Sequence, residues 1–229
     1  ADEWNVNGYY EHRQINLLNH DLLFGQWASP DLWVDQMWPK DHRIRIRKLA
    51  SLAMSPLATR RGAVKRRIEN NADRIHKLSH SLSETIVKDP RFSFVLEGWE
   101  EYGDIEDVLY CFRHPREVAS SISRQTGLPV FLTYSAWTDA IARFWAKPPN
   151  ARTFVVDYNR FFEAEYAQAE MKTLYSFLGR DYQPGEARDV LGMELDLSFR
   201  SGVAEQRSLP AKIDRLYREL QERKIMIGR

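Results

Sequence analysis

Apolar residues along the chain follow two kinds of pattern. Three short runs are nearly continuously apolar, as in strands buried on both faces of a parallel sheet; they are 84–88, 107–112 and 152–158. Between and after these runs, apolar residues recur at helical spacing, most clearly over 161–178 and 209–224. Strands that alternate with helices in this way predict an α/β fold with a parallel sheet.

Local signals refine this prediction. Gly179 is placed as the stop of the first helical segment, and Pro115 fits the first turn of a helix, where its missing N–H is harmless. The segment 41–83 is helical and basic in pattern, and we interpret it as an insertion that forms a lid or a side layer. Because the sequence has no internal repeat and no long Pro/Gly-rich linker, we expect one domain over 1–229.

Composition narrows the class of protein. The chain has 229 residues, 43% of them hydrophobic, and no apolar run approaches the roughly 20 residues that span a bilayer. Its first ten residues have neither the basic nor the apolar region of a signal peptide. The single cysteine, Cys111, allows no intramolecular disulfide, and its apolar surroundings predict a buried structural thiol. We therefore expect a soluble, cytoplasmic protein.

Charge is unevenly distributed although the net charge is only +1. Residues 41–80 hold eleven Lys or Arg against three acids, whereas residues 97–107 hold six acids and no base. A basic run of this kind can bind nucleic acid. It is more often a solvated helix face or a contact for an acidic ligand or neighbouring segment, so we do not expect nucleic acid as a partner. No feature of the sequence indicates an oligomeric state.

The candidate chemistry lies where two predicted strands end. Ligands of open α/β sheets gather at the carboxyl ends of the strands, and the turns KDPR (88–91) and RHPR (113–116) fall there. Arg113 offers a planar fork of donors that suits phosphate, and the helix start after it offers free N–H groups. Ser121 follows Arg113 by eight residues, about two turns into that helix. The pattern is consistent with one phosphate held by both side chains, although an arginine at a strand end is as often structural.

The segment VLYCFRHPREVASSI (108–122) resembles the 3′-phosphate-binding stretch of the sulfotransferase family, a strand followed by Arg-x-Pro and a helix with a serine eight residues after the arginine. Residues 7–23 resemble the Gly-Tyr-Phe-Glu segment that follows the phosphate loop in bacterial members. Residues 86–99 are similar to the family's KDPR strand end, and residues 154–179 to its Tyr-Glu-Asp strand and following helix. The resemblance covers most of the chain in the family's order.

This resemblance implies a fold and a reaction. The fold is a three-layer parallel sheet of the P-loop nucleoside triphosphate hydrolase/sulfotransferase type with a helical insertion. The reaction transfers a sulfuryl group from 3′-phosphoadenosine 5′-phosphosulfate (PAPS) to a hydroxyl or amine of a small-molecule or glycan acceptor, without a metal. Arg113 and Ser121 would bind the 3′-phosphate, and Tyr158 would either contact the adenine side or be a core aromatic residue. The segment FRSG (199–202) is similar to the family's phosphate-closing loop, with Ser201 in place of its lysine, which makes Arg200 a further candidate.

The resemblance also assigns catalytic candidates. Lys88 matches a lysine that contacts the transferring sulfuryl group, where a fixed cation stabilises the charge that develops on its oxygens. A general base must take the proton of the acceptor. Many members use a histidine two residues after this lysine, but Pro90 stands there. Glu11 is therefore our candidate base, with His12 in reserve, although each can also be a helix-surface residue and Lys88 a plain surface lysine.

One family feature lies outside this sequence. Members open with a strand and a Gly-x-x-Arg-Ser-Gly-Thr loop whose backbone N–H groups cradle the 5′-phosphosulfate. A truncated chain, a degenerate relative and a permutation each account for this. In the permutation, the final run ERKIMIGR (222–229) would supply the first strand as a parallel central strand, whereas a frayed helix end is the simpler interpretation. The alternative function is accordingly a non-catalytic nucleotide-binding or structural relative.

Overall fold

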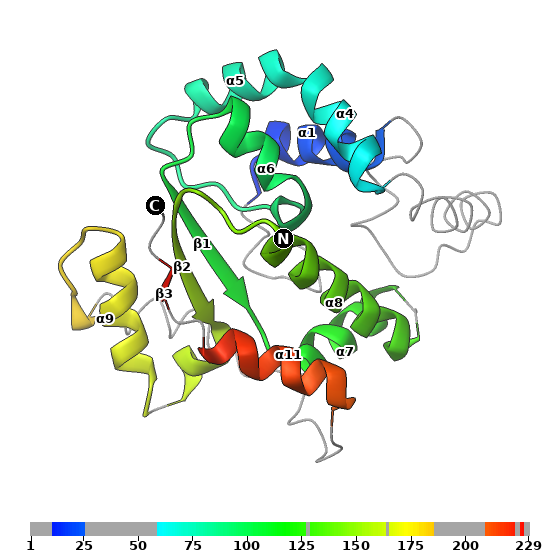
Figure 1. Cartoon of the computed structure of the whole chain (residues 1–229). Helices are drawn as coiled ribbons and strands as arrows, with labels where there is room; N and C mark the ends of the chain where they lie inside the picture. Colours follow the sequence, from blue (N-terminus) through cyan, green and yellow to red (C-terminus); the bar gives the residue numbers. More distant parts are fainter. Residues whose placement is uncertain are drawn as a thin grey trace. The chain divides into compact units, whose positions relative to one another are not determined.

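The computed structural model describes residues 11–25, 59–126, 129–163, 165–185, 209–222 and 225–226, which form a mixed α/β protein that is mostly helical (Figure 1). The chain falls into two units, each compact in itself. One comprises residues 1–106, 124–127 and 139–150, and the other comprises residues 107–123, 128–138 and 151–229. The expectation of a single domain stays a prediction. Among the described residues, no helix is long and apolar enough to cross a bilayer.

The second unit is built on a parallel pair of strands, β1 (Asp107–Phe112) and β2 (Arg152–Asp157), which lie side by side in Figure 1. Their register runs from the pair Asp107–Arg152 to the pair Phe112–Asp157. Both strands were predicted from the sequence, and the parallel pairing is confirmed. The fold class is thus confirmed at the level of a mixed α/β protein with a two-stranded parallel sheet.

The C-terminal run also joins this sheet. Strand β3 (Ile225–Met226) pairs with β2, opposite Thr153 and Phe154, so the strand order is β1-β2-β3. The pairing is antiparallel. The permutation requires this run to form a parallel central strand. That prediction is wrong for the described residues, because β3 lies at the edge of the sheet β1-β2-β3 and is antiparallel to β2. A frayed helix end is also wrong for Ile225 and Met226, because these two residues form a strand that pairs with β2.

The two long strands differ in burial. Residues 153–157 of β2 are all buried, as predicted for a strand covered on both faces. In β1 burial alternates, with Tyr110 and Phe112 buried and with Leu109 and Cys111 exposed. The predicted burial of Cys111 is wrong because one face of β1 is left open. An apolar run alone does not reveal whether one face or both are covered.

Helices follow each long strand. The carbonyl of His114 accepts the N–H groups of Glu117 and Val118, so α7 (Pro115–Thr126) begins with Pro115 in its first turn, as predicted. The next helix is α8 (Val130–Ala146), whose residues from 139 on are grouped with the first unit. After β2 come the 3₁₀ helix η2 (Tyr158–Phe162), α9 (Ala167–Phe177) and α11 (Ala211–Glu222).

The predicted helix 161–178 is divided into η2 and α9, and its stop signal is confirmed. Gly179 has a φ of +65°, which glycine adopts without strain. Its N–H donates to the carbonyl of Ser176 (3.1 Å), and the N–H of Arg180 donates to the carbonyl of Tyr175 (2.9 Å). These two bonds form a Schellman motif, which satisfies carbonyl groups at the helix end. Helix α11 lies within the helical pattern predicted over 209–224, and it buries apolar residues at helical spacing. They are Ile213, Tyr217 and Leu220.

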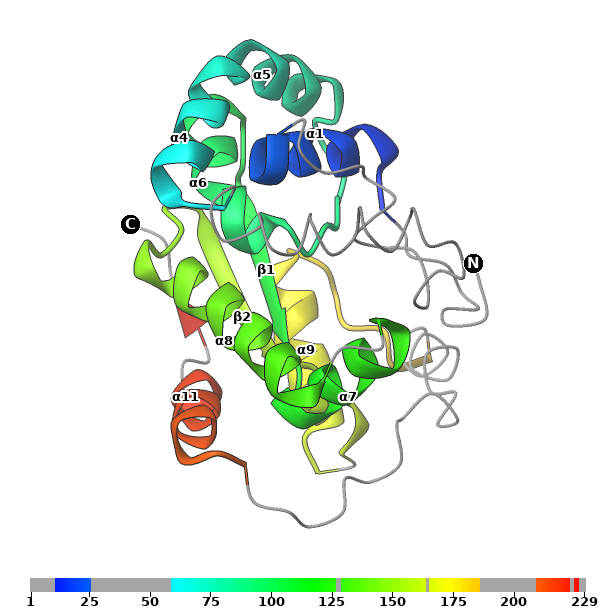
Figure 2. The same cartoon turned by 90° about the vertical axis from the view of Figure 1, so that its right-hand side faces the viewer.

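The first unit is a helical layer of α1 (Arg13–Phe24), α4 (Arg61–Asn70), α5 (Ala72–Ser81) and α6 (Phe92–Tyr102), which pack on one another (Figure 2). Their shared core contains Leu18, Leu22, Ile68, Ile75 and Trp99, among others. Helices α4 and α5 confirm the helical, basic pattern of the predicted insertion over 61–81. The part of the insertion before residue 59 lies outside the described residues.

The strand predicted over 84–88 is wrong. These residues form a turn and an extended connection between α5 and α6, without a neighbouring strand in the described part of the chain. Ile86 is 82% exposed, and Glu84 has a φ of +66°. The run holds only two apolar residues, Ile86 and Val87, so it has too little surface to bury to stabilise a strand.

Gly98 of α6 permits the close contact between α6 and α4. A Cβ atom at this position would lie 2.6 Å from Cγ2 of Ile68, a buried core residue. We predict that Gly98→Ala lowers the free energy of unfolding by about 1–3 kcal/mol, because overpacking moves side chains out of their preferred rotamers. Urea denaturation measures the change. Gly62→Ala in α4 is the matched control: its Cβ meets no atom within 4 Å, and alanine is the better helix former, so stability should stay unchanged or rise. Equal losses in both variants would contradict the packing argument.

Candidate functional site

The carboxyl ends of β1 and β2 bring two of the predicted ligand-binding residues together. The last paired residues are Phe112 and Asp157, so Arg113 and Tyr158 each follow directly after a strand end. The guanidinium carbon of Arg113 lies 5.2 Å from the centre of the Tyr158 ring, within the range of a cation–π contact. Arg113 therefore lies at the strand end where the sequence placed it, with its charge beside an aromatic face.

An ion pair holds one edge of Arg113. Its Nε donates to Oε2 of Glu117 at 2.6 Å, one turn along α7, and the two side chains are 29% and 20% exposed. Oε1 of Glu117 accepts from Nδ2 of Asn159 (3.0 Å), and Oδ1 of Asn159 accepts the backbone N–H of His114 (2.9 Å). Within the described residues, neither terminal nitrogen of Arg113 donates a hydrogen bond. The guanidinium is thus fixed on one edge and one face, and its outer edge is open in the sense that it donates no hydrogen bond to a described residue.

A second carboxylate, that of the buried Asp157, contacts this cluster through Asn159. Asp157 accepts hydrogen bonds from the hydroxyl of Tyr217 (3.2 Å), Nε2 of Gln221 (2.9 Å) and the backbone N–H of Asn159 (3.0 Å). The rings of Tyr217 and His114 form an edge-to-face contact, with centroids 5.0 Å apart. Burial lowers the pKa of His114 and raises the pKa of Tyr217, so both side chains favour their neutral forms.

Ser121 is half-buried on α7, and its hydroxyl makes no hydrogen bond to another described residue. Its hydroxyl is available, but its convergence with Arg113 on one anion stays a prediction. Arg200 lies outside the described residues.

The two predicted catalytic residues meet in the first unit. Nζ of Lys88 lies 3.2 Å from Oε1 of Glu11, across 77 positions of the chain. Lys88 is 57% exposed in its side chain and Glu11 only 12%. The other carboxylate oxygen of Glu11 accepts from Nδ2 of Asn16 and lies 4.0 Å from Nη1 of Arg91. The reserve candidate His12 occupies the N-cap position of α1 without a side-chain capping bond. Its buried Nδ1 has no hydrogen-bond partner among the described residues.

A buried network positions Arg91 beside Glu11. Asp89 has a fully buried carboxylate that accepts from Nη1 of Arg91 at 3.0 and 3.2 Å and from the backbone N–H of Arg91 at 2.8 Å. Asn19 donates to Asp89 (3.2 Å) and accepts from Nε1 of Trp99 (2.7 Å). Burial raises the pKa of Asp89, and the positive charge of Arg91 opposes that rise. The KDPR turn is therefore anchored in the core by its aspartate and arginine, and its lysine is exposed to solvent.

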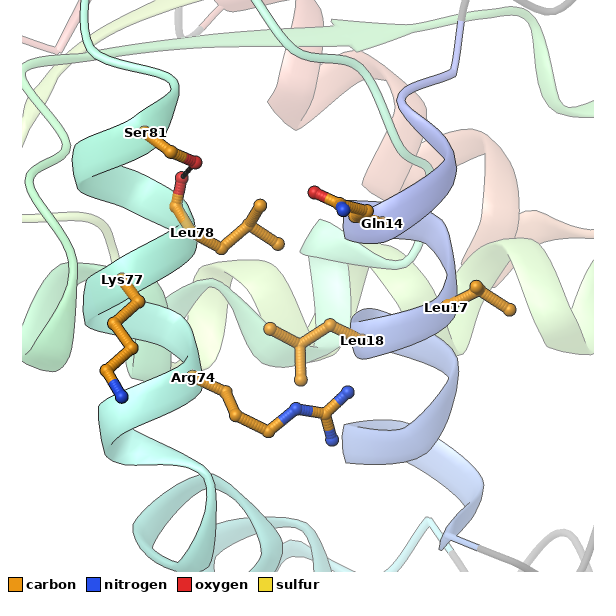
Figure 3. A pocket seen from close by; sticks show the side chains of 7 residues that line it. All are labelled: Gln14, Leu17, Leu18, Arg74, Lys77, Leu78 and Ser81. Atoms are coloured by element: carbon orange, nitrogen blue, oxygen red, sulfur yellow. Dashed lines mark hydrogen bonds between the residues drawn. The ribbon is translucent and has the colours of Figure 1, made fainter.

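A groove of about 400 Å³ lies between α1 and α5 in the same unit (Figure 3). Its lining residues are Gln14, Leu17, Leu18, Arg74, Lys77, Leu78 and Ser81. Leu18 points from α1 toward α5, and Leu78 points from α5 toward α1. The groove shares no residue with the Lys88–Glu11 pair, and none of the predicted site residues lines it.

Sequence reasoning missed several residues of both clusters. Glu117 stands four residues after Arg113 on a predicted helix, and this spacing is the one that forms ion pairs, so it could have been found. Asp157 and Asn159 lie on either side of the end of the predicted strand 152–158, where ligand-binding side chains gather. Asn19 and Trp99 carry no such signal, because their contacts with each other and with Asp89 depend on the tertiary fold.

Comparisons of the chain with protein-family models, with curated proteins and with solved structures found no match.

The Asp89–Arg91 pair yields a prediction about stability. Asp89→Asn keeps the size of the side chain but cannot ionise, so it mimics the protonated form of Asp89 beside Arg91. Because the folded state raises the pKa of Asp89 above its ordinary value of 3.8, the folded protein binds this proton more tightly than the unfolded chain. The Asp89 contribution to wild-type stability therefore falls as pH rises from about 3.8 through the raised pKa.

The measurement is urea denaturation of wild type and Asp89→Asn across that pH interval. The stability advantage of the wild type should shrink as pH rises. Asp73→Asn, an exposed residue of α5, is the control and should change stability little. An advantage that grows with pH would mean that pairing with Arg91 outweighs burial in setting the pKa of Asp89.

Proposed function

We propose that this chain binds PAPS, or the desulfated adenosine 3′,5′-bisphosphate, and transfers the sulfuryl group to a hydroxyl or amine of a small-molecule or glycan acceptor. The observation that carries the proposal is Arg113, which directly follows β1 and keeps the outer edge of its guanidinium open beside Tyr158. An open arginine fork at the carboxyl end of a parallel strand is a chemically suitable place for a phosphate.

The neighbouring elements support an anion at this position. Helix α7 starts two residues after Arg113, and the positive end of its dipole favours negative charge nearby. Ser121, on the same helix, has a hydroxyl that can donate to a phosphate oxygen. Tyr158 supplies an aromatic face near the strand end, which suits an adenine ring. These groups make up the nucleotide-binding set of the proposal, with Arg200 as a further member.

The proposed fold extends the observed strand pair. β1 and β2 would belong to a three-layer parallel sheet of the P-loop nucleoside triphosphate hydrolase/sulfotransferase type. Their parallel register and the helix that follows β1 support this assignment. We also expect a cytoplasmic protein, since a chain with a single cysteine suits a reducing compartment.

The proposed chemistry uses the Lys88–Glu11 pair. An acceptor oxygen attacks the sulfur of PAPS and forms a new S–O bond while the S–O bond to the 5′-phosphate breaks. The proton of the acceptor passes to the Glu11 carboxylate, and the bisphosphate leaves with its electron pair. Lys88 stabilises the negative charge on the transferring and leaving oxygens. Glu11 must release Lys88 in this step, and the contact with Asn16 keeps the carboxylate in place.

The same ion pair also favours the second candidate function. A carboxylate flanked by Lys88 and Arg91 is a common structural arrangement, and ion pairs of this kind need no catalytic role. On this alternative the chain is a relative that binds the nucleotide, or only keeps the fold, without catalysing transfer. Nucleotide binding and turnover are therefore tested separately.

Calorimetry with adenosine 3′,5′-bisphosphate tests the binding proposal. We expect micromolar binding that Arg113→Ala weakens by about tenfold or more, since charge-assisted hydrogen bonds contribute about 1.5–3 kcal/mol. Ser121→Ala should weaken binding by a smaller factor. Arg124→Ala is the matched control, because this exposed arginine lies near the other end of α7. The absence of binding by a folded wild-type protein would leave only the structural alternative.

The role of Lys88 is tested by a rate. Lys88→Ala should lower the rate of sulfuryl transfer from PAPS by at least about 100-fold while changing nucleotide affinity by less than about threefold, because the contact strengthens in the transition state. The exposed Lys77→Ala is the control and should leave the rate unchanged. Equal losses of rate and affinity would make Lys88 a binding residue. A wild-type protein that binds the nucleotide but transfers no sulfuryl group to any hydroxyl or amine would support the non-catalytic alternative.

A further inference from the structure

The contacts of Arg113 form a chain that leads from one strand end to the other. Glu117 holds Nε of Arg113, Asn159 holds the other oxygen of Glu117, and the carbonyl oxygen of the same amide accepts the N–H of His114. Asn159 is itself fixed, because its backbone N–H donates to the buried Asp157. The orientation of the Arg113 side chain, which follows β1, thus depends on Asn159, which follows β2.

Two effects of Glu117 on a phosphate at Arg113 oppose each other. Its carboxylate repels the phosphate and reduces the net positive charge of the site. It also restricts a guanidinium that would otherwise rotate freely, because it holds Nε of Arg113. An arginine loses less rotamer entropy on binding when its fork is already oriented.

We propose that Glu117 and Asn159 are positioning residues for Arg113, and that their main effect is to orient its open edge for the 3′-phosphate. Three contacts of this cluster carry the inference: the bond of Arg113 Nε to Glu117, the bond of Asn159 to Glu117 and the cation–π contact of Arg113 with Tyr158. The inference rests on the proposed function, because it assumes that Arg113 binds the 3′-phosphate. It assigns roles to two residues that the phosphate-binding motif does not include.

Two substitutions of Glu117 separate orientation from charge. Glu117→Gln removes the negative charge and keeps one oxygen that can accept the Nε–H bond, but its amide nitrogen cannot accept from Asn159. Glu117→Ala removes both acceptors. If orientation dominates, Glu117→Ala should weaken the site most, and Glu117→Gln should lie between it and the wild type. If the carboxylate acts only by repulsion, both variants should bind more tightly than the wild type.

The readout is the preference for adenosine 3′,5′-bisphosphate over adenosine 5′-monophosphate, two ligands that differ only in the 3′-phosphate. We expect Glu117→Ala to reduce the ratio of the two dissociation constants by about tenfold. Asn159→Ala should reduce it by a similar or smaller factor, and the double variant should be no worse than Glu117→Ala alone, because the two residues act in series. Glu69→Ala is the control, since Glu69 pairs with Lys65 at the same spacing on an exposed helix face.

A second measurement needs no nucleotide. The Nε–H proton of Arg113, observed by nuclear magnetic resonance, should exchange slowly in the wild type and in Glu117→Gln and should exchange fast in Glu117→Ala. Fast exchange in all three proteins, or a nucleotide preference in Glu117→Ala equal to or above that of the wild type, would overturn the inference. A wild type without any preference for the bisphosphate would instead overturn the proposed function, and the positioning role would fall with it.

Discussion

The parallel pairing of β1 and β2 is the constraint on which the second unit depends. Because the strands run in the same direction, the residues that follow them emerge at one edge of the sheet. Arg113 and Tyr158 meet there although 45 residues separate them in sequence, and Asp157 receives its donors from α11 at the same edge. An antiparallel pair would have placed these two residues at opposite ends.

The two polar clusters differ in how they are held. In the first unit, Asp89 and Arg91 are almost completely buried, so their pairing offsets part of the loss of hydration and fixes the KDPR turn to α1 and α6. In the second unit, Arg113 and Glu117 stay within reach of water, where an ion pair contributes little to stability but sets a geometry. The buried pair thus suits a structural role and the half-exposed pair suits contact with a ligand.

The sequence predicted those elements whose signal is local. The runs 107–112 and 152–157 are long enough and apolar enough to specify strands, and Gly179 marks a helix end through its own backbone freedom. The prediction over 84–88 is wrong because two apolar residues do not suffice for a strand. The burial of Cys111 depends on whether another element covers its face of β1, which is a tertiary property. For the candidate site, the positions of Arg113 and Lys88 followed from motifs, whereas the partners Glu117 and Asn19 depend on helix geometry and on packing.

The register of the two strands has a consequence for how the second unit tolerates change. A slip of one residue would displace Tyr158 by about 3.3 Å along the strand and would turn the buried side chains of β2 to the opposite face. β2 resists such a slip because it has a neighbour on each side, β1 and β3. A single insertion or deletion within either long strand would therefore disturb the residues proposed to bind phosphate even though it altered none of them. In this unit, strand length is itself a constraint on the candidate site.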